Sequence, residues 1–293
     1  MIDRGSDTGK TVVITGSTGG LGQELCRALC RRGASLILVN RNPQKAARQK
    51  QELQRLYPNS SVELVTADLS SPSSVRAACR ILKEKPVDVL IHNAGVYDLP
   101  KHIGESGYDD VFTVDFLSPF SITTALTPLL EQRKSRVIVV GSIAYRYRKS
   151  RPDDPDFSYT NFCNFVYGNA KRYLMASHRE WAAQHPSVLF AMTHPGISFT
   201  GITNHYPKWL FAIIRRPMKI LFMKPAKAMK SILNGMEQTT GYSQWIGPRI
   251  LDVWGKPAVR MARIPVAESR RIYQFACQAV AEMNQKEEGS AFG

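Results

Sequence analysis

The chain has 293 residues, 43% apolar and 22% charged, which is typical of a folded globular protein and argues against disorder. Its net charge of +15 is compatible with nucleic acid, a membrane surface or an anionic ligand as a partner. No apolar run approaches the roughly 18 residues of a membrane span, and the first apolar segment is too short for a signal peptide. We therefore expect a cytoplasmic protein. The scattered cysteines and histidines predict buried free thiols and no metal site.

Apolar periodicity predicts strands alternating with helices. Short apolar or β-branched runs predict strands at residues 11–15, 35–40, 61–67, 87–93, 136–142 and 187–193. Helical spacing predicts helices at residues 21–32, 43–57, 71–85, 107–131 and 164–184. Several strands are continuous apolar runs, the pattern of parallel strands covered on both faces. The sequence therefore predicts an α/β fold, a doubly wound parallel sheet of Rossmann type, in a single domain.

Glycines cluster between the first predicted strand and the first predicted helix, in TVVITGSTGGLGQEL. Glycine lets backbone N–H groups approach an anion closely, and the following helix directs its free N–H groups at the same point. In this strand–turn–helix context, Gly16, Gly20 and Gly22 predict a site for the pyrophosphate of a dinucleotide rather than an empty turn. No Gly-Lys-Ser/Thr follows, which argues against a nucleoside-triphosphate loop.

Further motifs follow in a fixed order: Asp68-Leu69, Asn93-Ala94-Gly95, Ser142, Tyr167-x-x-x-Lys171 and Pro195-Gly196. Together with the glycine loop, this set resembles the short-chain dehydrogenase/reductase family over residues 10–200. The segment LVNRN and the long gap between Ser142 and Tyr167 resemble its retinol dehydrogenase-like branch. The resemblance implies a core for cofactor binding and catalysis at residues 10–196, a substrate lid at 197–240, and a C-terminal strand and helix at 241–293.

The resemblance also implies which residues hold a nicotinamide dinucleotide. The set comprises Gly16, Ser17, Thr18, Gly20, Leu21, Asp68, Leu69, Asn93, Ala94, Gly95, Tyr167, Lys171, Pro195, Gly196 and Thr200. Within it, the family implies that Asp68 bonds the adenine amino group. The resemblance likewise implies that the backbone of residues 93–95 would line a ribose and that Lys171 would bond the ribose hydroxyls.

The end of the second predicted strand favours NADP(H) over NAD(H). A free ribose 2′-hydroxyl usually meets an acidic side chain there, but this chain has Asn40 followed by Arg41. A charge pair at about 4 Å is worth roughly 4 kcal/mol at an effective dielectric of about 20. Arg41 is therefore suited to a 2′-phosphate, and the alternative is a solvated loop arginine.

The pattern Tyr-x-x-x-Lys occurs twice, at Tyr145–Lys149 and at Tyr167–Lys171. Two prolines among acidic residues follow the first copy and oppose a helix, so we expect Tyr145 in an exposed basic loop. The second copy lies on a predicted helix, near the sheet edge where ligands bind. We predict Tyr167 as general acid in reduction and base in oxidation, with Lys171 and the positive nicotinamide ring of the oxidised cofactor lowering its pKa. Ser142 would donate a hydrogen bond to the substrate oxygen.

One position departs from the family pattern. In the family, the helix after the fourth strand carries a pattern similar to Val-Asn-x-x-x-x-Phe. Its Asn helps to hold a proton-relay water. This chain reads TVDFLSPF, with Asp115 at the Asn position. A carboxylate there could accept from the same water and pair with Lys171. Alternatively, it could over-stabilise the Lys171 ammonium and slow proton exchange, and the sequence leaves both outcomes open.

A basic, apolar segment lies between Trp181 and Met236, where no Asp or Glu occurs. Its cations are Lys208, Arg215, Arg216, Lys219, Lys224, Lys227 and Lys230. The resemblance implies that this region covers the substrate, and the dense apolar residues in it then imply a hydrophobic substrate. Three interpretations stay open for the cations: a plain lid, peripheral contact with an anionic membrane, or an anionic substrate. Stacking platforms and a nucleic-acid-binding fold are missing, so we expect no nucleic-acid partner.

These observations predict an NADP(H)-dependent oxidoreductase that interconverts a carbonyl and an alcohol on a bulky apolar small molecule. One alternative is a nucleotide-sensing binding protein that keeps the fold without turnover, which only the Asp115 departure supports. Another is a peripheral membrane scaffold, which only the basic segment supports. The family resemblance further implies a homo-oligomer.

Overall fold

The computed structural model describes residues 6–97, 99–147, 154–156, 163–196 and 223–290. Its strands form one eight-stranded sheet in the order β3-β2-β1-β4-β5-β6-β7-β8, parallel except for the β7–β8 pair. The strands are β1 (Thr11–Thr15), β2 (Ser35–Asn40), β3 (Val62–Thr66), β4 (Val89–His92), β5 (Arg136–Val140), β6 (Leu189–Thr193), β7 (Gln244–Ile250) and β8 (Trp254–Met261). The predicted doubly wound parallel sheet is confirmed.

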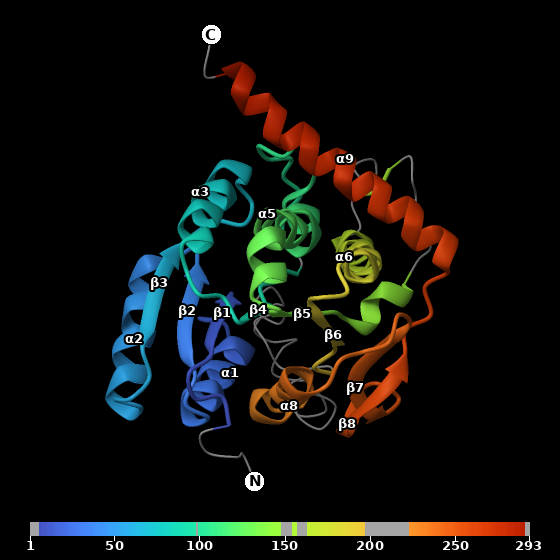
Figure 1. The fold of residues 1–293 in the computed structure, drawn as a ribbon. Coiled ribbons are helices and arrows are strands. Elements are labelled where there is room, and N and C mark those ends of the chain that lie inside the picture. Colours follow the sequence, from blue (N-terminus) through green and yellow to red (C-terminus); the bar gives the residue numbers. More distant parts are fainter. Residues whose placement is uncertain (1–5, 98, 148–153, 157–162, 197–222, 291–293) are drawn as a thin grey trace, which may run out of the picture.

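Helices cover both faces of the sheet (Figure 1). One face carries α1 (Gly20–Arg31), α2 (Pro43–Leu56) and α8 (Pro225–Glu237). The other carries α3 (Pro72–Lys83), α4 (Asp110–Phe112), η1 (Thr113–Leu117), α5 (Ser118–Gln132) and α6 (Cys163–Gln184), with α9 (Val266–Ser290) across α6. A short 3-10 helix, η2 (Ile143–Arg146), follows β5.

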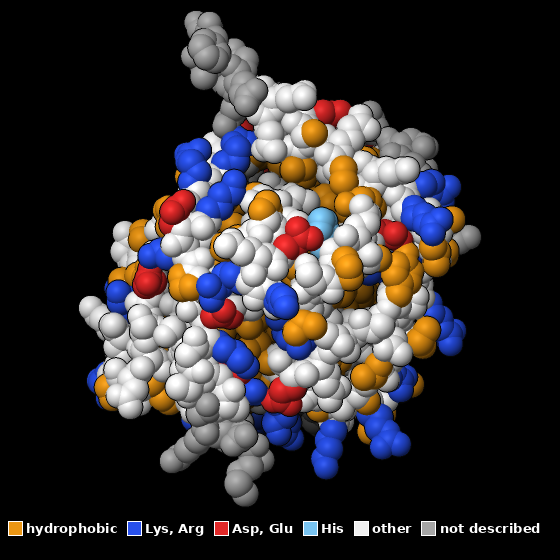
Figure 2. Space-filling model, in the orientation of Figure 1, with side chains coloured by type: hydrophobic (Ala, Val, Ile, Leu, Met, Phe, Trp, Pro, Cys, Tyr) orange, Lys and Arg blue, Asp and Glu red, His pale blue; other side chains and the backbone are white. Residues whose placement is uncertain are grey.

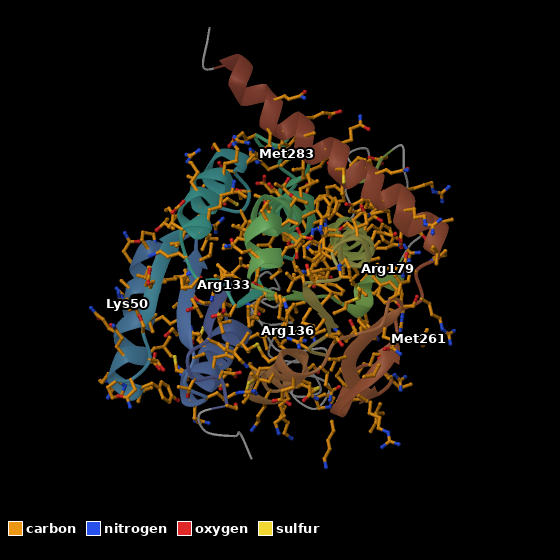
Figure 3. The ribbon with its side chains drawn as sticks, viewed as in Figure 1. Lys50, Arg133, Arg136, Arg179, Met261 and Met283 are labelled. Atoms are coloured by element: carbon orange, nitrogen blue, oxygen red, sulfur yellow. The ribbon has the colours of Figure 1, made fainter. Side chains whose placement is uncertain are left out.

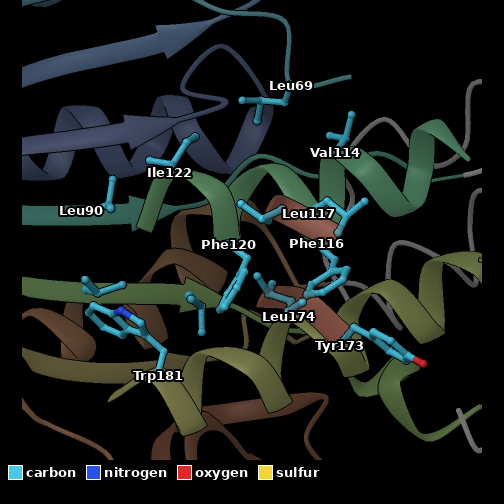
Figure 4. Close-up of a cluster of buried hydrophobic side chains, with 14 of the residues drawn as sticks. Leu69, Leu90, Val114, Phe116, Leu117, Phe120, Ile122, Tyr173, Leu174 and Trp181 are labelled. Carbon is cyan, nitrogen blue, oxygen red and sulfur yellow. The ribbon is translucent and has the colours of Figure 1, made fainter. Parts of the chain in front are cut away.

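Two apolar cores separate the helices from the sheet, because successive strand side chains point to opposite faces. Val12 and Ile14 of β1 join the core under α1 and α8, whereas Val13 joins the core under α5 and α6. Figure 4 shows the second core, where Phe116 and Phe120 lie between the sheet and α6.

The C-terminal segment adds two strands, where the sequence analysis expected one. The strands β7 and β8 form an antiparallel hairpin that continues the sheet beyond β6. Pro248 and Pro257 obscure the strand pattern, because proline is disfavoured inside strands. The turn between the strands places Leu251 and Asp252 at positive φ, 51° and 56°. At the far end of the hairpin, Arg179 of α6 donates to the Ile264 carbonyl at 2.8 Å, ahead of α9 (Figure 3).

The long predicted helix at 107–131 is interrupted. The structure has α4, then the π-helical turn η1, then α5, which carries Pro119 in its first turn. A π-turn shifts the side chains that follow it relative to a regular helix and often marks a functional site. Here η1 carries Asp115, so this irregularity decides where that carboxylate lies.

Three predicted buried thiols, Cys26, Cys30 and Cys79, are buried, but Cys277 is exposed on α9, so the expectation was wrong for that residue. In the described part of the chain, no helix is long and apolar enough to cross a membrane. Within the same residues, no group of three or more His, Cys, Asp or Glu side chains could hold a metal ion.

Close backbone packing fixes the glycine loop between β1 and α1. Gly16 has a φ of +67°, and its N–H donates to the Val39 carbonyl at 2.9 Å. A Cβ on Gly22 would lie 2.5 Å from the Gly16 carbonyl oxygen and 2.8 Å from the Ser17 Cα. A Cβ on Gly20 would meet nothing closer than Pro225 Cγ at 4.0 Å. Gly22 is therefore required by the fold of the loop, whereas Gly20 faces open space.

The substitution Gly22→Ala should lower the free energy of unfolding by roughly 1–3 kcal/mol, because backbone atoms must move to admit the methyl group. The matched control Gly20→Ala has room for its methyl and gains helix propensity, so its stability should be unchanged or slightly higher. Urea denaturation of both variants tests this difference. Equal losses in the two variants would contradict the packing argument.

Candidate active site

The candidate site lies where neighbouring parallel strands end at one sheet edge. The strands β1 and β4 pair directly, and the loops that follow them are joined by side-chain hydrogen bonds. Asn93 Nδ2 donates to the carbonyls of Thr15 and Gly16, each at 3.0 Å. Thr15 Oγ1 accepts from the backbone N–H groups of Asn93 and Ala94 at 3.1 and 3.0 Å. The Asn93 side chain thus fastens the glycine loop, and Thr15 is a positioning residue absent from the predicted set.

A second polar network fastens the glycine loop to α2. The Ser17 hydroxyl donates to Gln49 Oε1 at 2.7 Å, and Gln49 Nε2 donates to the Ser17 carbonyl at 2.9 Å. Asn40 Nδ2 donates to Ser17 Oγ at 2.7 Å, while Asn40 Oδ1 accepts from the Thr18 N–H at 3.3 Å. The Ser17 and Asn40 side chains are therefore buried in the loop's support and do not face outward.

The sequence analysis missed Gln49, although a signal was present. The buried positions of α2 are Ala46, Gln49 and Leu53, so a glutamine occupies a stripe that faces the sheet. A buried side-chain amide needs hydrogen-bond partners, and the glycine loop supplies them. Next to this network, Arg41 directly follows β2 and is exposed.

The start of α1 is a candidate anion site. Its N-cap, Gly19, makes no side-chain capping hydrogen bond, and the first turn of the helix has no acidic residue. Free N–H groups at a helix start favour an anion such as a phosphate. The open space at Gly20 leaves room for one. This geometry fits the pyrophosphate of a dinucleotide, as the glycine pattern predicted.

The remaining predicted cofactor residues lie on other strand ends or outside the described residues. Asp68 follows β3, and its Oδ1 accepts from the Ser70 N–H and hydroxyl at 3.0 and 2.7 Å. The buried Leu69 packs in the core under α5, and Gly196 follows β6 with a φ of +81°. Thr200 lies outside the described residues.

Helix α6 carries Tyr167 and Lys171 one turn apart. The Lys171 Nζ lies 5.6 Å from the centroid of the Tyr167 ring, and the Ser142 side chain is hydrogen-bonded to Tyr167. Ser142 ends the β5 segment and caps η2, accepting from the Ala144 N–H at 3.2 Å. A Cβ on Gly168 would lie 2.6 Å from the Ala144 carbonyl, so a glycine beside Tyr167 lets α6 approach η2 closely. The structure therefore brings together the predicted serine, tyrosine and lysine.

Asp115 forms a buried ion pair with Lys171. The Asp115 Oδ1 to Lys171 Nζ distance is 2.7 Å, with side-chain exposures of 0% and 5%. Asp115 Oδ2 accepts from the Val96 N–H at 2.9 Å, and Lys171 Nζ donates to the Val140 carbonyl at 3.4 Å. A Cβ on Gly95 would lie 2.7 Å from Asp115 Oδ1, so only glycine fits beside the pair. The structure contains the pairing with Lys171, and the effect of that pairing on proton exchange stays a prediction.

The protein groups around Tyr167 act on its pKa in opposite directions. Burial raises the pKa of Tyr167, Lys171 opposes that rise, and Asp115 adds to it. Burial alone would lower the pKa of Lys171, but the charges of Asp115 and Tyr167 raise it above its ordinary value. Burial raises the pKa of Asp115, and Lys171 opposes the change. Lys171 thus acts on Tyr167 in the predicted direction without overcoming burial and Asp115.

The expectation of an exposed loop at Tyr145 was wrong. Tyr145 lies on η2 with 1% exposure, and its ring packs edge-on against Trp245 with centroids 5.5 Å apart. Its hydroxyl accepts from the Arg263 N–H at 3.0 Å and from Arg146 Nε at 3.2 Å. The C-terminal hairpin covers this tyrosine, which the local sequence did not indicate. Its partner in the motif, Lys149, lies outside the described residues.

A second aromatic side chain reaches Tyr167. The Tyr97 ring stands edge-on to the Tyr167 ring with centroids 5.0 Å apart. Tyr97 follows the Asn93-Ala94-Gly95 motif by two residues and was absent from the predicted set. The aromatic residue shortly after that motif was the sequence feature that could have indicated this contact with Tyr167.

Comparisons with known proteins agree with this geometry. The short chain dehydrogenase family model matches residues 10–152. Dehydrogenase/reductase SDR family member 12 of Bos taurus is 34% identical over 191 residues, covering 64% of this chain and 60% of that protein. Retinol dehydrogenase 12 of Mus musculus is 32% identical over 232 residues, covering 77% of this chain and 72% of that protein. The chain therefore matches less than two thirds of the bovine relative's length.

Solved structures agree on the fold. An uncharacterized protein from Mycobacterium paratuberculosis superposes with a TM-score of 0.73 at 23% identity, covering 95% of this chain and 96% of that one. A short-chain dehydrogenase from Sphingobium yanoikuyae in complex with NADPH superposes with a TM-score of 0.59 at 21% identity, covering 78% and 84%. Taken with the sequence matches, these likenesses show that the chain belongs to the short-chain dehydrogenase/reductase family, in its retinol dehydrogenase-like branch.

Proposed function

We propose that the protein is an NADP(H)-dependent oxidoreductase that interconverts a carbonyl and an alcohol, with Tyr167 as general acid and base. The observation that carries the proposal is the assembly of Ser142, Tyr167 and Lys171 at the sheet edge that also holds the glycine loop. The nicotinamide, when bound, supplies or accepts the hydride at the carbonyl carbon. The residues of this chain handle the oxygen and its proton.

Tyr167 moves the proton in this proposal. In reduction, its O–H bond breaks as the proton passes to the carbonyl oxygen, and in oxidation the phenolate takes the proton from the alcohol. Ser142, hydrogen-bonded to Tyr167, can donate to the same substrate oxygen and hold it in place. The position of both groups on ordered elements supports transfer over a fixed distance.

The cofactor preference rests on the end of β2. The Asn40 amide is engaged by Ser17 and Thr18, so it is not free to bond a ribose 2′-hydroxyl. The next side chain, Arg41, is exposed and cationic, which suits a 2′-phosphate. The relative of known structure from Sphingobium yanoikuyae, which is in complex with NADPH, supports the same choice.

The substrate and the cellular place of the protein stay predictions. A bulky apolar carbonyl or alcohol fits the retinol dehydrogenase relatives, but the proposed lid residues 197–222 lie outside the described residues. Three cations of the basic segment are exposed, Lys224 at the N-cap of α8 and Lys227 and Lys230 on the helix, which supports peripheral contact with an anionic membrane. The cytoplasmic location stays a prediction. On the face that Figure 2 shows, Lys and Arg side chains form several separate groups with acidic residues among them.

A nucleotide-sensing binding protein without turnover is the second candidate. Asp115 in place of the family's Asn is its only support. The assembled Ser142, Tyr167 and Lys171 argue against it, because a cofactor-binding role alone does not require a tyrosine hydroxyl bonded to a serine.

The substitution Tyr167→Phe should lower turnover by at least about 100-fold, because the proton donor is removed, while NADPH binding stays nearly unchanged. The control Tyr145→Phe should keep turnover. It should cost roughly 1 kcal/mol of stability, because the Arg263 N–H loses its acceptor. NADPH absorbance against a panel of aldehydes and ketones measures turnover, and thermal unfolding measures stability. An inactive Tyr145→Phe beside an active Tyr167→Phe would place the chemistry elsewhere.

The substitution Arg41→Ala should weaken NADPH binding by at least about tenfold and NADH binding little, because only NADPH presents the charged 2′-phosphate. The control Arg55→Ala removes an equal charge at the far end of α2 and should change neither affinity. Fluorescence titration with both nucleotides measures the effect. Equal weakening of NADPH and NADH in Arg41→Ala would remove the charge argument.

A further inference from the structure

We propose that Asp115 biases this active site toward carbonyl reduction: by pairing with Lys171 it cancels the buried positive charge that would otherwise help Tyr167 to ionise. This inference rests on the proposed function above and adds the favoured direction of the reaction. It assigns Asp115 as a positioning residue that acts through Lys171.

The geometry makes the pairing a fixed part of the site. Both oxygens of Asp115 have partners, with Lys171 Nζ at 2.7 Å from Oδ1 and the Val96 N–H at 2.9 Å from Oδ2. The π-turn η1 directs the carboxylate into the site, and the close approach at Gly95 leaves no room for a larger residue. Since both side chains are nearly inaccessible to water, solvent screens their charges weakly.

The charge balance follows from this pair. With an uncharged Asn at position 115, Lys171 would be a lone buried cation, and ionising Tyr167 would neutralise it. With Asp115 present, the pair already sums to zero, so a tyrosinate at the partly buried Tyr167 would be an extra, uncompensated negative charge beside it. Such a charge is costly in a poorly solvated site. The directions of the pKa shifts agree, because Asp115 adds to the raised pKa of Tyr167.

Within the residues that the structure describes, the other groups that face the pair and the tyrosine do not restore the missing positive charge. Tyr167 interacts with Ser142, which follows β5, and with the ring of Tyr97 in the loop after β4. Tyr147, just after η2, acts on it electrostatically. All three side chains carry a hydroxyl group, and none of them carries a basic group.

Lys171 faces the Val140 carbonyl from β5 and is within electrostatic reach of His92 on β4. Burial, His178 and Lys171 all lower the pKa of His92 well below its ordinary value, so His92 stays neutral. Among the described residues, Asp115 and Lys171 are therefore the charged groups that decide how readily Tyr167 ionises.

The two reaction directions need opposite forms of Tyr167. Reduction starts from the phenol, whose proton moves to the carbonyl oxygen as the hydride adds to carbon, and solvent then returns a proton to the phenolate. Oxidation starts from the phenolate, which takes the alcohol proton as the hydride leaves carbon. A group that keeps Tyr167 protonated extends reduction to higher pH and confines oxidation to higher pH.

The test is Asp115→Asn, which removes the charge and keeps an oxygen that can accept from the Val96 N–H. The rate of alcohol oxidation should rise at a lower pH, and the rate of carbonyl reduction should begin to fall at a lower pH, each by at least about 1 unit. Loss of packing alone would lower both rates without moving either profile. The control Asp110→Asn removes a carboxylate from the same helical segment, where it bonds His102, and should leave both profiles in place.

A spectroscopic titration separates this inference from the proposed function. The ultraviolet absorbance of tyrosinate is measured against pH for the wild type and for Asp115→Asn, each minus its Tyr167→Phe counterpart. A shift to lower pH in Asp115→Asn supports the inference, and coinciding titrations overturn it, whatever the turnover. Absence of turnover with any carbonyl, in the wild type and the variant alike, would remove the proposed function instead. If Asp115→Asn does not fold, Asp115→Ser, which also lacks the charge, takes its place with the same expected shift.

Discussion

The buried ion pair between Asp115 and Lys171 is the interaction around which the candidate site is arranged. Taking two charges out of water is costly, and their attraction offsets that cost only when the geometry is good and the remaining polar atoms are satisfied. Here the backbone of Val96 and Val140 supplies those contacts. The pair therefore ties η1, α6 and two strand ends together, and losing one partner would leave an uncompensated buried charge.

Aromatic packing holds the two ends of that pair in place. Phe112, at the end of α4, and Phe116 of η1 both pack edge-on against Tyr173 of α6. The ring centroids lie 5.3 Å apart in each pair. From α9, Phe275 packs against Tyr173 at 5.6 Å, so the C-terminal helix closes the same cluster. Such contacts contribute through burial and through the favourable geometry of edge-on rings. The position of Lys171 on α6, two residues before Tyr173, is thus set from three elements.

The cofactor side of the site is organised differently, through neutral polar contacts rather than charge. Asn93 and Thr15 join the loops after β4 and β1, while Gln49 and Asn40 hold Ser17. Each of these hydrogen bonds joins two groups of the protein, so the protein itself shapes the loop. Pre-formed loops lower the ordering cost of binding. The exposed Arg41 remains at the rim as the charged feature of this side.

The sequence by itself determined the alternating strands and helices and the order of the site motifs, because continuous apolar runs, cap residues and glycines are local signals. Helix α3 illustrates this, since a helix was predicted at residues 71–85 and the structure has one at Pro72–Lys83 with Ser71 as its N-cap. The tertiary structure alone decided features that depend on contacts across the chain. The hairpin covers Tyr145, the π-turn aims Asp115 at Lys171, and Gln49 meets Ser17 from 32 residues away. A local sequence pattern carries no record of such partners, because their energies come from burial and charge pairing between distant segments.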